Sequence, residues 1–301
     1  MSPPKRTVSV ALLVCGPMLP QVVPEHGDQP EIIENFLRKS LKSFANSDET
    51  DWRDVDLAVH SYDVVGKMEY PAEQEIDGYG AMLITGSVAD AYAQLEWIRI
   101  LQTFIVHLAR DHPGVRLFGI CFGHQIISIA LGGDCVNNDG KWESGPTKIR
   151  LTDVGRRVFG KGHSELVLHE MHQDHVPLVP RGFHLLASTD ISMNQGMLAL
   201  NGDALATFSE PPQHSNIELG ISSFSPKDIH ILTVQAHPEF TNPIVAKIVD
   251  VLVADQILTE SFGVDVAKQI ELQGPDRIEG DGLVVGRAFW RVLGVGGARK
   301  G

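Results

Sequence analysis

The sequence predicts an α/β protein built on a doubly wound, mostly parallel sheet with helices on both faces. Over the first 130 residues, short β-branched runs alternate with segments whose apolar residues recur at helical spacing, which is typical of βαβ units. Between about residues 132 and 240, the apolar runs are separated by turn residues, which indicates antiparallel hairpins. We therefore expect a small antiparallel sheet to be added to the parallel one.

The first half of the chain contains four predicted strands and two long predicted helices. The first strand is the apolar run 8–14, and the helix after it follows Pro30, a residue favoured in the first turn of a helix. In both helices the apolar residues fall on one stripe. The strands are expected at residues 8–14, 57–60, 81–85 and 116–120, and the helices at residues 31–44 and 95–108.

The second half begins with a predicted helix at residues 125–131, closed by two glycines. Residues 274–301 are rich in glycine and carry a single apolar cluster around Phe289 and Trp290. We therefore expect one domain over residues 7–258 and a C-terminal appendage, part of it disordered, over residues 259–301. The remaining strands are expected at 148–151, 166–168, 183–187, 197–201 and 229–234, followed by a helix at 242–258.

Composition excludes several classes of partner. The 301 residues are 43% hydrophobic and 21% charged, with a formal charge of −13 and a pI near 5.4. Such a surface repels nucleic-acid phosphates and anionic lipids, so neither nucleic acid nor a membrane is expected as a partner. The run 8–14 is too short for a secretory core or a membrane span. Three cysteines without a signal peptide favour a reducing compartment, and we expect a cytoplasmic protein with at least one free thiol.

The strongest chemical signal is a cysteine between two glycines, Gly119-Ile120-Cys121-Phe122-Gly123, where a predicted strand runs directly into a helix. This is the nucleophile elbow of G-x-S-x-G hydrolases with sulfur in place of oxygen. Glycine is needed on both sides because the strand and helix backbones come close together. The helix N-terminus favours the thiolate, which makes Cys121 a candidate nucleophile.

The alternative for Cys121 is a buried structural role, because free cysteines are among the most buried residues. The flanking glycines and the immediate helix favour the nucleophile. Cys15 lies inside an apolar run and is expected to fill the core, and Cys135 is expected to be inert.

A thiolate that attacks an acyl carbon needs an imidazole to transfer a proton and a carboxylate to orient that imidazole. His237 and Glu239 supply both, two residues apart after the predicted strand 229–234. Pro238 favours an extended residue before it. Taken alone, the pair is equally consistent with a solvent-facing strand end. Together with the elbow, it predicts a Cys121–His237–Glu239 triad.

An oxyanion hole requires two N–H groups aimed at the developing negative charge. The N–H of Phe122, directly after the cysteine, is one candidate. The other is Gly86 in the turn Thr85-Gly86-Ser87, which follows the predicted strand adjacent to the elbow strand in a doubly wound sheet.

Several segments together resemble the class I glutamine amidotransferases, a family with a flavodoxin-like fold. They are GICFGHQ at 119–125, HPE at 237–239 and ITGS at 84–87. MHQDHV at 171–176 resembles the family's His-x-Asp-x-Val loop, and WESGP at 142–146 resembles its segment after the elbow helix. The closest likeness is to stand-alone members, which include plant γ-glutamyl peptidases and fungal homologues. The resemblance covers about residues 7 to 255.

The resemblance implies a reaction. Cys121 would attack the γ-carbonyl of glutamine, glutathione or a glutathione conjugate, His237 would act as base and then as acid, and Glu239 would orient it. A thioester intermediate would release ammonia or an amine before water completes the cycle.

The resemblance also implies the contacts around the substrate. Gly86 and Phe122 would supply the oxyanion N–H groups, Gln125 would hydrogen-bond the substrate, and the loop from His172 to Asp174 would border the pocket.

Three functions remain open from the sequence. One is a γ-glutamyl hydrolase or peptidase that acts alone, another is a glutaminase subunit that delivers ammonia to a separate synthetase, and the third is a catalytically silent binding module. Ser87 stands where many amidotransferases have proline, a departure shared with the peptidase-like branch, and no synthetase is fused to this chain.

The run 169–175, His-Glu-Met-His-Gln-Asp-His, raises a metal hypothesis, because clustered histidines and carboxylates are common metal ligands. Gln173 occupies the second histidine position of the H-E-x-x-H pattern, so an ordinary loop beside the active site is favoured. No phosphate-binding G-x-x-x-x-G-K-[ST] pattern is present. We therefore expect no metal, no cofactor and no use of ATP.

Overall fold

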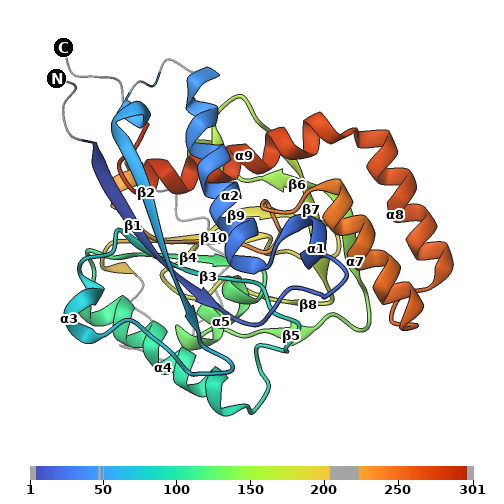
Figure 1. Cartoon of the computed structure of the whole chain (residues 1–301), viewed down its shortest axis with the longest axis horizontal. Coiled ribbons are helices and arrows are strands. Elements are labelled where there is room, and N and C mark those ends of the chain that lie inside the picture. Colours follow the sequence, from blue (N-terminus) through green and yellow to red (C-terminus); the bar gives the residue numbers. More distant parts are fainter. Residues whose placement is uncertain (1–4, 47–48, 50, 204–223, 297–301) are drawn as a thin grey trace.

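The parallel half of the central sheet consists of neighbouring strands that alternate in sequence with helices (Figure 1). The computed structural model describes residues 5–46, 49, 51–203 and 224–296. Each neighbouring pair in this half is parallel. In spatial order the strands are β2 (Val55–Asp63), β1 (Arg6–Val14), β3 (Ala81–Ile84), β4 (Arg116–Ile120) and β11 (Ile229–Val234).

The antiparallel half continues the same sheet from β11, and a small second sheet lies apart from it. The continuing strands are β10 (Gly196–Leu200), β9 (His184–Ser188), β6 (Glu143–Leu151) and β7 (Glu165–His172). The separate sheet pairs β5 (Val136–Asn137) with β8 (Asp174–His175). The predicted α/β fold is confirmed, although most antiparallel strands extend the main sheet. Each predicted element is present, with ends shifted by no more than five residues.

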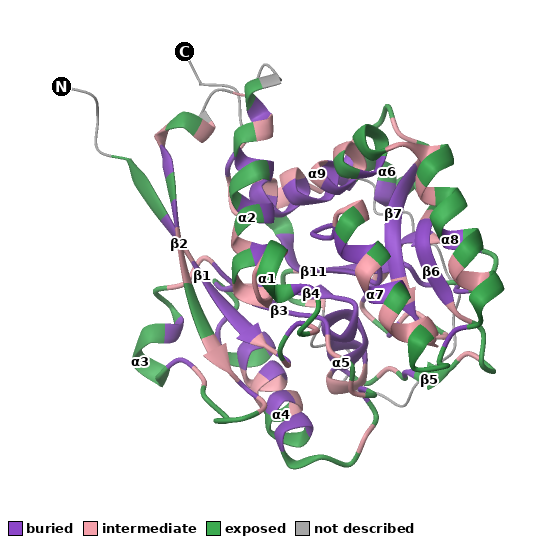
Figure 2. Cartoon of the chain, turned by 45° about the vertical axis from the view of Figure 1, so that its right-hand side comes forward, coloured by how far each residue is buried: buried purple, intermediate pink, exposed green. Residues whose placement is uncertain are grey.

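Helices cover both faces of the sheet because its central strands are apolar on both sides. Val10 of β1 packs in one cluster with Phe36 and Phe289, whereas the next residue, Ala11, packs in another with Ile98. The first face carries α2 (Gln29–Lys42), α6 (Asp153–Phe159) and α9 (Pro275–Val292). The second carries α3 (Glu73–Ile76), α4 (Glu96–Asp111) and α5 (Phe122–Ala130). Figure 2 shows the buried strands between these helices.

A third apolar cluster forms around α7 (Asn242–Ala254), beside α8 (Glu260–Gln273) and close to α1 (Val23–His26). Val266 of α8 and Val245 of α7 belong to this cluster, as does Phe240, which lies next to the residues expected at the active site. The packing of α7 therefore fixes the segment between β11 and α7.

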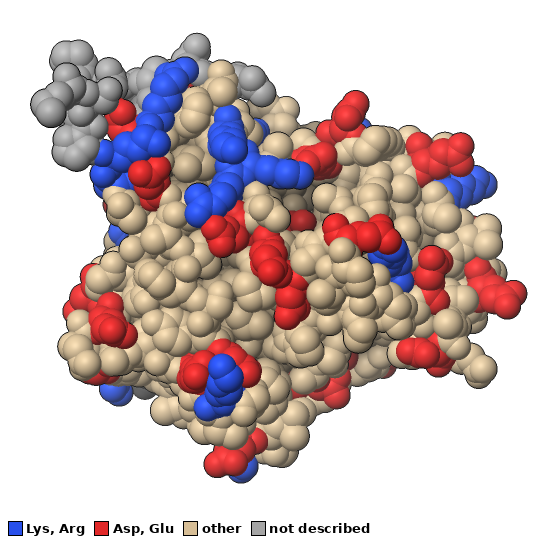
Figure 3. Space-filling model, in the orientation of Figure 1, with Lys and Arg blue, Asp and Glu red and all other residues tan. Residues whose placement is uncertain are grey.

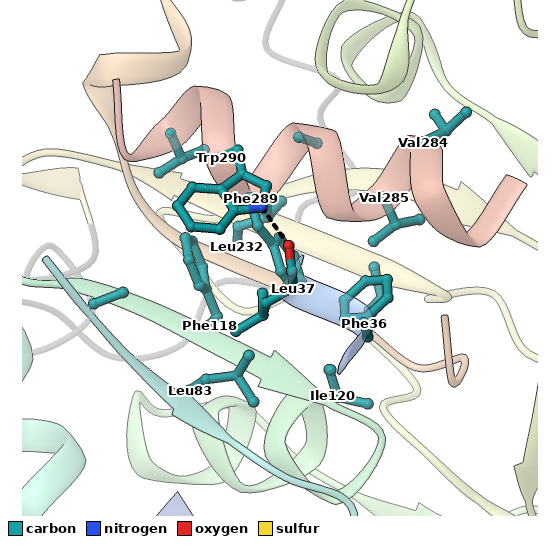
Figure 4. Close-up of a cluster of buried hydrophobic side chains, with 14 of the residues drawn as sticks. Phe36, Leu37, Leu83, Phe118, Ile120, Leu232, Val284, Val285, Phe289 and Trp290 are labelled. Carbon is teal, nitrogen blue, oxygen red and sulfur yellow. Dashed lines mark hydrogen bonds between the residues drawn. The ribbon is translucent and has the colours of Figure 1, made fainter. Parts of the chain in front are cut away.

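The C-terminal segment differs from the expected appendage. Residues of α9 lie in the core against one face of the sheet, where Phe289 stacks on Phe118 of β4 at 4.5 Å (Figure 4). Its glycines serve close packing: a Cβ at Gly282 would meet the Pro238 carbonyl oxygen at 2.6 Å, and one at Gly286 would collide with Ser40 of α2. The glycine content that suggested disorder therefore lets a helix approach its neighbours.

The surface of the described residues carries mixed charge. On the face shown in Figure 3, acidic side chains are spread over the molecule and basic side chains gather over α2, which contains Arg38, Lys39 and Lys42. None of the helices in the described ranges has the length and apolar character that a bilayer crossing requires.

Candidate active site

Cys121 lies at the corner between β4 and α5, in a backbone conformation that few residues other than glycine adopt. Its φ of 51° and ψ of −105° are strained for an L-residue. The corner is tight: a Cβ at Gly119 would meet the backbone of Gly123 at 2.6 Å, and a Cβ at Gly123 would collide with the carbonyl of Ile84. The two glycines therefore permit the turn, as the sequence predicted.

His237 and Glu239 follow β11, the strand beside β4. The imidazole Nδ1 lies 2.8 Å from Glu239 Oε1. Because an ionised carboxylate only accepts hydrogen bonds, this contact places the proton on Nδ1 and leaves Nε2 for another partner. The imidazole stacks on Phe240 with ring centroids 4.2 Å apart, and the His237 backbone N–H donates to the His169 carbonyl at 2.8 Å. Two contacts therefore hold the ring, and a third holds its backbone.

The imidazole of His237 and the side chain of Cys121 lie beside each other, because a Cβ built on Gly86 would stand 2.8 Å from the ring Cε1 and 3.8 Å from the Cβ of Cys121. Both side chains are buried. Burial lowers the pKa of His237, but the negative charges of Cys121 and Glu239 and the hydrogen bonds to them outweigh it and hold that pKa well above its usual value. A charged imidazole beside a thiol is the arrangement that nucleophilic cysteines use.

Gly86 and Phe122, the two residues predicted to form an oxyanion hole, both lie next to Cys121. A Cβ built on Gly86 would stand 3.8 Å from the Cβ of Cys121. The Gly86 carbonyl accepts hydrogen bonds from Gln29 Nε2 at 3.2 Å and from Thr85 Oγ1 at 3.0 Å, which fixes the turn after β3. Phe122 is the first residue of α5, so no preceding helical turn offers its N–H a carbonyl. These two positions can serve an oxyanion next to Cys121.

Gln125 is buried one turn into α5, and its amide binds protein groups. Nε2 donates to the Asp174 carbonyl at 3.0 Å and to Gln235 Oε1 at 3.2 Å. The Asp174 carboxylate lies near the surface, where it accepts from Tyr92 at 3.3 Å and from Asn137 at 3.1 Å. Gln125 therefore ties the 172–174 loop to the elbow helix.

The side chain of His172, at the start of that loop, is buried among charged groups. Its Nδ1 donates to the Asp174 carbonyl at 2.9 Å, while Nε2 stands 3.3 Å from Glu143 Oε2 and 3.2 Å from Glu170 Oε2. Burial lowers the pKa of His172, but the two glutamates outweigh it and raise the pKa to about 10, with a further contribution from Cys121. A buried cation therefore stands within electrostatic reach of the thiol.

The two glutamates were missed by the sequence analysis. Glu143 is the direct cross-strand partner of His172 in the β6–β7 pair, and Glu170 lies two residues before His172 on the same face of β7. Glu143 sits in the WESGP segment that resembled the family. That segment pointed to Glu143, but its contact with His172 could be seen only from the register of β6 and β7.

The histidine run 169–175 does not gather around one point. His169 and His172 are three residues apart on β7, so their side chains leave opposite faces. His169 Nε2 contacts Asn242 Oδ1 at 2.9 Å, whereas His172 binds the glutamates. Both ring nitrogens of His172 therefore face the Asp174 carbonyl and the two glutamates, away from His169.

All three cysteines are free. Cys15 is 1% exposed and lies in the apolar core of the sheet, in agreement with the expected filler role. Burial raises the pKa of Cys15, and burial together with the Asp174 carboxylate raises that of Cys135. Both remain neutral thiols at neutral pH. The expectation of at least one free thiol is confirmed.

A family model described as glutamine amidotransferase class-I matches residues 53–207. The chain belongs to this family. A glutamine amidotransferase-like protein of Schizosaccharomyces pombe is 28% identical over 263 residues, 87% of this chain and 91% of that protein. γ-Glutamyl peptidase 3 of Arabidopsis thaliana is 27% identical over 215 residues, 70% of this chain and 74% of the peptidase.

Two further comparisons concern a synthetase and the fold. The GMP synthase of Thiobacillus denitrificans is 38% identical over 91 residues, 28% of this chain and 17% of the synthase. The crystal structure of a glutamine amidotransferase from Thermotoga maritima superposes with a TM-score of 0.64 and 14% identity, over 95% of this chain and 98% of that one. The family inferred from the motifs is confirmed, and so is its fold.

Proposed function

We propose that the protein is a stand-alone cysteine hydrolase that cleaves the γ-glutamyl amide bond of glutamine, glutathione or a glutathione conjugate. One observation carries this proposal: a strained, buried cysteine at a β-to-α corner lies beside an imidazole that a carboxylate holds at 2.8 Å. This arrangement performs acyl transfer in cysteine hydrolases.

In the first half of the reaction, the Cys121 thiolate attacks the γ-carbonyl carbon and a C–S bond forms. The carbonyl oxygen becomes negative beside the N–H groups of Gly86 and Phe122, which stabilise it. As the C–N bond breaks, the His237 imidazolium gives its Nε2 proton to the leaving amine. The products are a thioester on Cys121 and a free amine or ammonia.

In the second half, a water molecule attacks the thioester while His237 Nε2 takes one of its protons. The C–S bond breaks, the γ-carboxylate is released and the thiolate–imidazolium pair returns. Glu239 stabilises the imidazolium at each stage. We propose that Gln125 and the loop from His172 to Asp174 border the substrate, and that Gln125 acts mainly by holding the loop, since its amide donates to Asp174.

Peptidase-like action is supported by the similarity to γ-glutamyl peptidase 3 over most of both chains and by Ser87 after the oxyanion glycine. The alternative is a glutaminase subunit that delivers ammonia to a separate synthetase, and the 91-residue match to GMP synthase favours it. Three free thiols, two of them buried and neutral, support a reducing compartment such as the cytoplasm.

The purified protein should be incubated with glutamine, glutathione and glutathione conjugates, with products detected by mass spectrometry. We expect turnover without a partner, its abolition in Cys121→Ala, and a loss of at least about 10³-fold in His237→Ala. The matched control is Cys15→Ala, whose rate should stay near that of the wild type. Turnover only with an added synthetase would favour the subunit. No turnover and no labelling of Cys121 by a glutamine-analogue electrophile would contradict catalysis altogether.

A further inference from the structure

Three metal-ligand side chains converge at the end of the strands opposite the active site. Glu73 comes from α3, His107 from α4, and His112 directly follows α4. The Nε2 atoms of the two histidines are 3.3 Å apart, and they lie 2.9 Å and 3.1 Å from the two carboxylate oxygens of Glu73. Figure 1 shows α3 beside the C-terminal end of α4. Strands β3 and β4 begin here, whereas Cys121 follows the end of β4.

The outer nitrogen of each imidazole is held by its own carboxylate. His107 Nδ1 lies 2.8 Å from Asp111 Oδ2, and His112 Nδ1 lies 2.8 Å from Asp77 Oδ1. Since a carboxylate only accepts, both Nδ1 atoms carry protons, and the Nε2 lone pairs point at each other and at Glu73. Histidines that bind metals are held by carboxylates in this way.

The two Nε2 atoms face each other at 3.3 Å with the Glu73 carboxylate beside both. A cation between them would bind all of these acceptors at once.

The spacing matches a coordination sphere. Ligand atoms bound to zinc at about 2.0–2.1 Å stand roughly 2.9 to 3.4 Å apart for angles between 90° and the tetrahedral value. The three separations between the Nε2 atoms and the carboxylate oxygens, 2.9, 3.1 and 3.3 Å, fall in this range. Two imidazoles and one carboxylate are borderline donors, which suit zinc and its neighbours better than calcium or magnesium.

The charge of the group also suits a divalent cation. Glu73, Asp77 and Asp111 contribute three negative charges beside two imidazoles, and Arg110 offsets one of them through contacts of 2.7 to 3.1 Å with Asp111. His112 is nearly buried while the Glu73 side chain is 65% exposed, so an ion has an entry path from solvent and an open coordination position facing it.

We propose that Glu73, His107 and His112 form a binding site for one zinc-class divalent cation, which joins α3 to the C-terminal end of α4. Asp111 and Asp77 orient the two imidazoles. The site lies apart from the thiol and takes no part in the proposed hydrolysis, so its role is to stabilise the packing of α3 against the C-terminal end of α4.

The test is isothermal titration of zinc chloride into chelator-treated wild-type protein, repeated in buffers of different ionisation enthalpy. We expect one equivalent bound with a Kd below about 10 µM and a release of protons. At zinc concentrations about 100-fold above Kd, the melting temperature should rise by about 4 °C, and EDTA should reverse the rise.

Substitutions then locate the ion. Glu73→Gln changes an exposed side chain and leaves folding intact, and it should weaken zinc binding at least 10-fold, as should Asp77→Asn through the loss of its hold on His112. A double variant, His107→Asn with His112→Asn, should no longer bind the one equivalent of zinc. The control, His60→Asn, removes an exposed histidine elsewhere and should bind as the wild type does. Failure of the wild type to bind zinc, or an unchanged affinity in Glu73→Gln and the double variant, overturns the proposal.

Discussion

The Cα of Gly86 faces the imidazole of His237 so closely that a Cβ there would meet the ring Cε1 at 2.8 Å. The turn after β3 therefore touches the ring on the side next to the thiol of Cys121, while Phe240 stacks on the ring at 4.2 Å. Glycine at this position leaves the space that the ring occupies, in addition to the N–H that we propose it offers to an oxyanion.

Replacing Gly86 with alanine is expected to displace the His237 ring. Because a misplacement of about 1 Å can cost 10²-fold in rate, we expect kcat to fall by about 10² or more while the protein stays folded. The measurement is kcat for γ-glutamyl hydrolysis together with the melting temperature. Gly280→Ala is the matched control, because a Cβ there meets nothing within 4 Å. A wild-type kcat in Gly86→Ala would contradict the prediction, because it would show that the added methyl group does not displace the His237 ring.

The alkaline limb of the pH profile should report His237. Its pKa is held well above the usual value, and the acylation step requires the imidazolium. Activity is therefore expected to persist through neutral pH and to fall as the pH rises through the raised pKa. Removing the charge of Glu239 in Glu239→Gln should lower the pKa of His237, so this limb should move to lower pH by about one unit or more.

The profile is measured as kcat/KM from pH 6 to pH 11, with Glu260→Gln as the control at an exposed position of α8. The control should reproduce the wild-type profile. An alkaline limb that is identical in Glu239→Gln and the wild type would mean that a group other than His237 titrates there.

Local sequence was sufficient to predict the elbow, because the strand, the strained residue and the helix are contiguous at residues 116–130. His237 was assigned to Cys121 because a nucleophilic thiol needs an imidazole, and the parallel pairing of β4 with β11 places the two together. Glu143 could not be predicted, because its contact with His172 depends on the register of β6 and β7. The packing of α9 could not be predicted for another reason. Glycine is typical of disordered segments, yet here it permits close contact with Pro238.

The buried cation His172 should make the stability of the protein depend on pH. Its folded pKa of about 10 exceeds the unfolded value near 6.5, so its contribution is fully present below pH 6.5 and is lost as the pH rises through 10. His172→Gln leaves Glu143 and Glu170 without their cation, and we expect it to cost on the order of 3–5 kcal/mol at pH 7.

Urea unfolding of the wild type and His172→Gln at pH 7, 8.5 and 10 tests this dependence. The difference in unfolding free energy should shrink toward high pH, and subtracting the variant removes the titration of other groups. His60→Gln, at an exposed position, should follow the wild type throughout. A difference that stays constant with pH would show that His172 is neutral in the folded protein.

Trp290 makes the C-terminal helix part of the core, and its removal should destabilise the whole protein. The side chain is fully buried, and its Nε1 donates to the Leu37 carbonyl at 3.0 Å and to Ser40 Oγ at 3.1 Å (Figure 4). Trp290→Ala should cost about 3–5 kcal/mol through lost contacts and a cavity. Trp290→Phe keeps most of the apolar contact and loses the hydrogen bonds, so it should cost about 1–2 kcal/mol.

The measurement is the free energy of unfolding in urea, monitored by far-ultraviolet circular dichroism. This signal reports the backbone, so loss of the tryptophan does not remove it. Leu272→Ala, in α8 with its side chain 73% exposed, should change stability by no more than about 0.5 kcal/mol. If Trp290→Ala unfolded with the wild-type free energy, α9 would be a dispensable appendage after all. A single cooperative transition shifted to lower urea would instead show that residues 275–292 fold together with the sheet that carries Cys121.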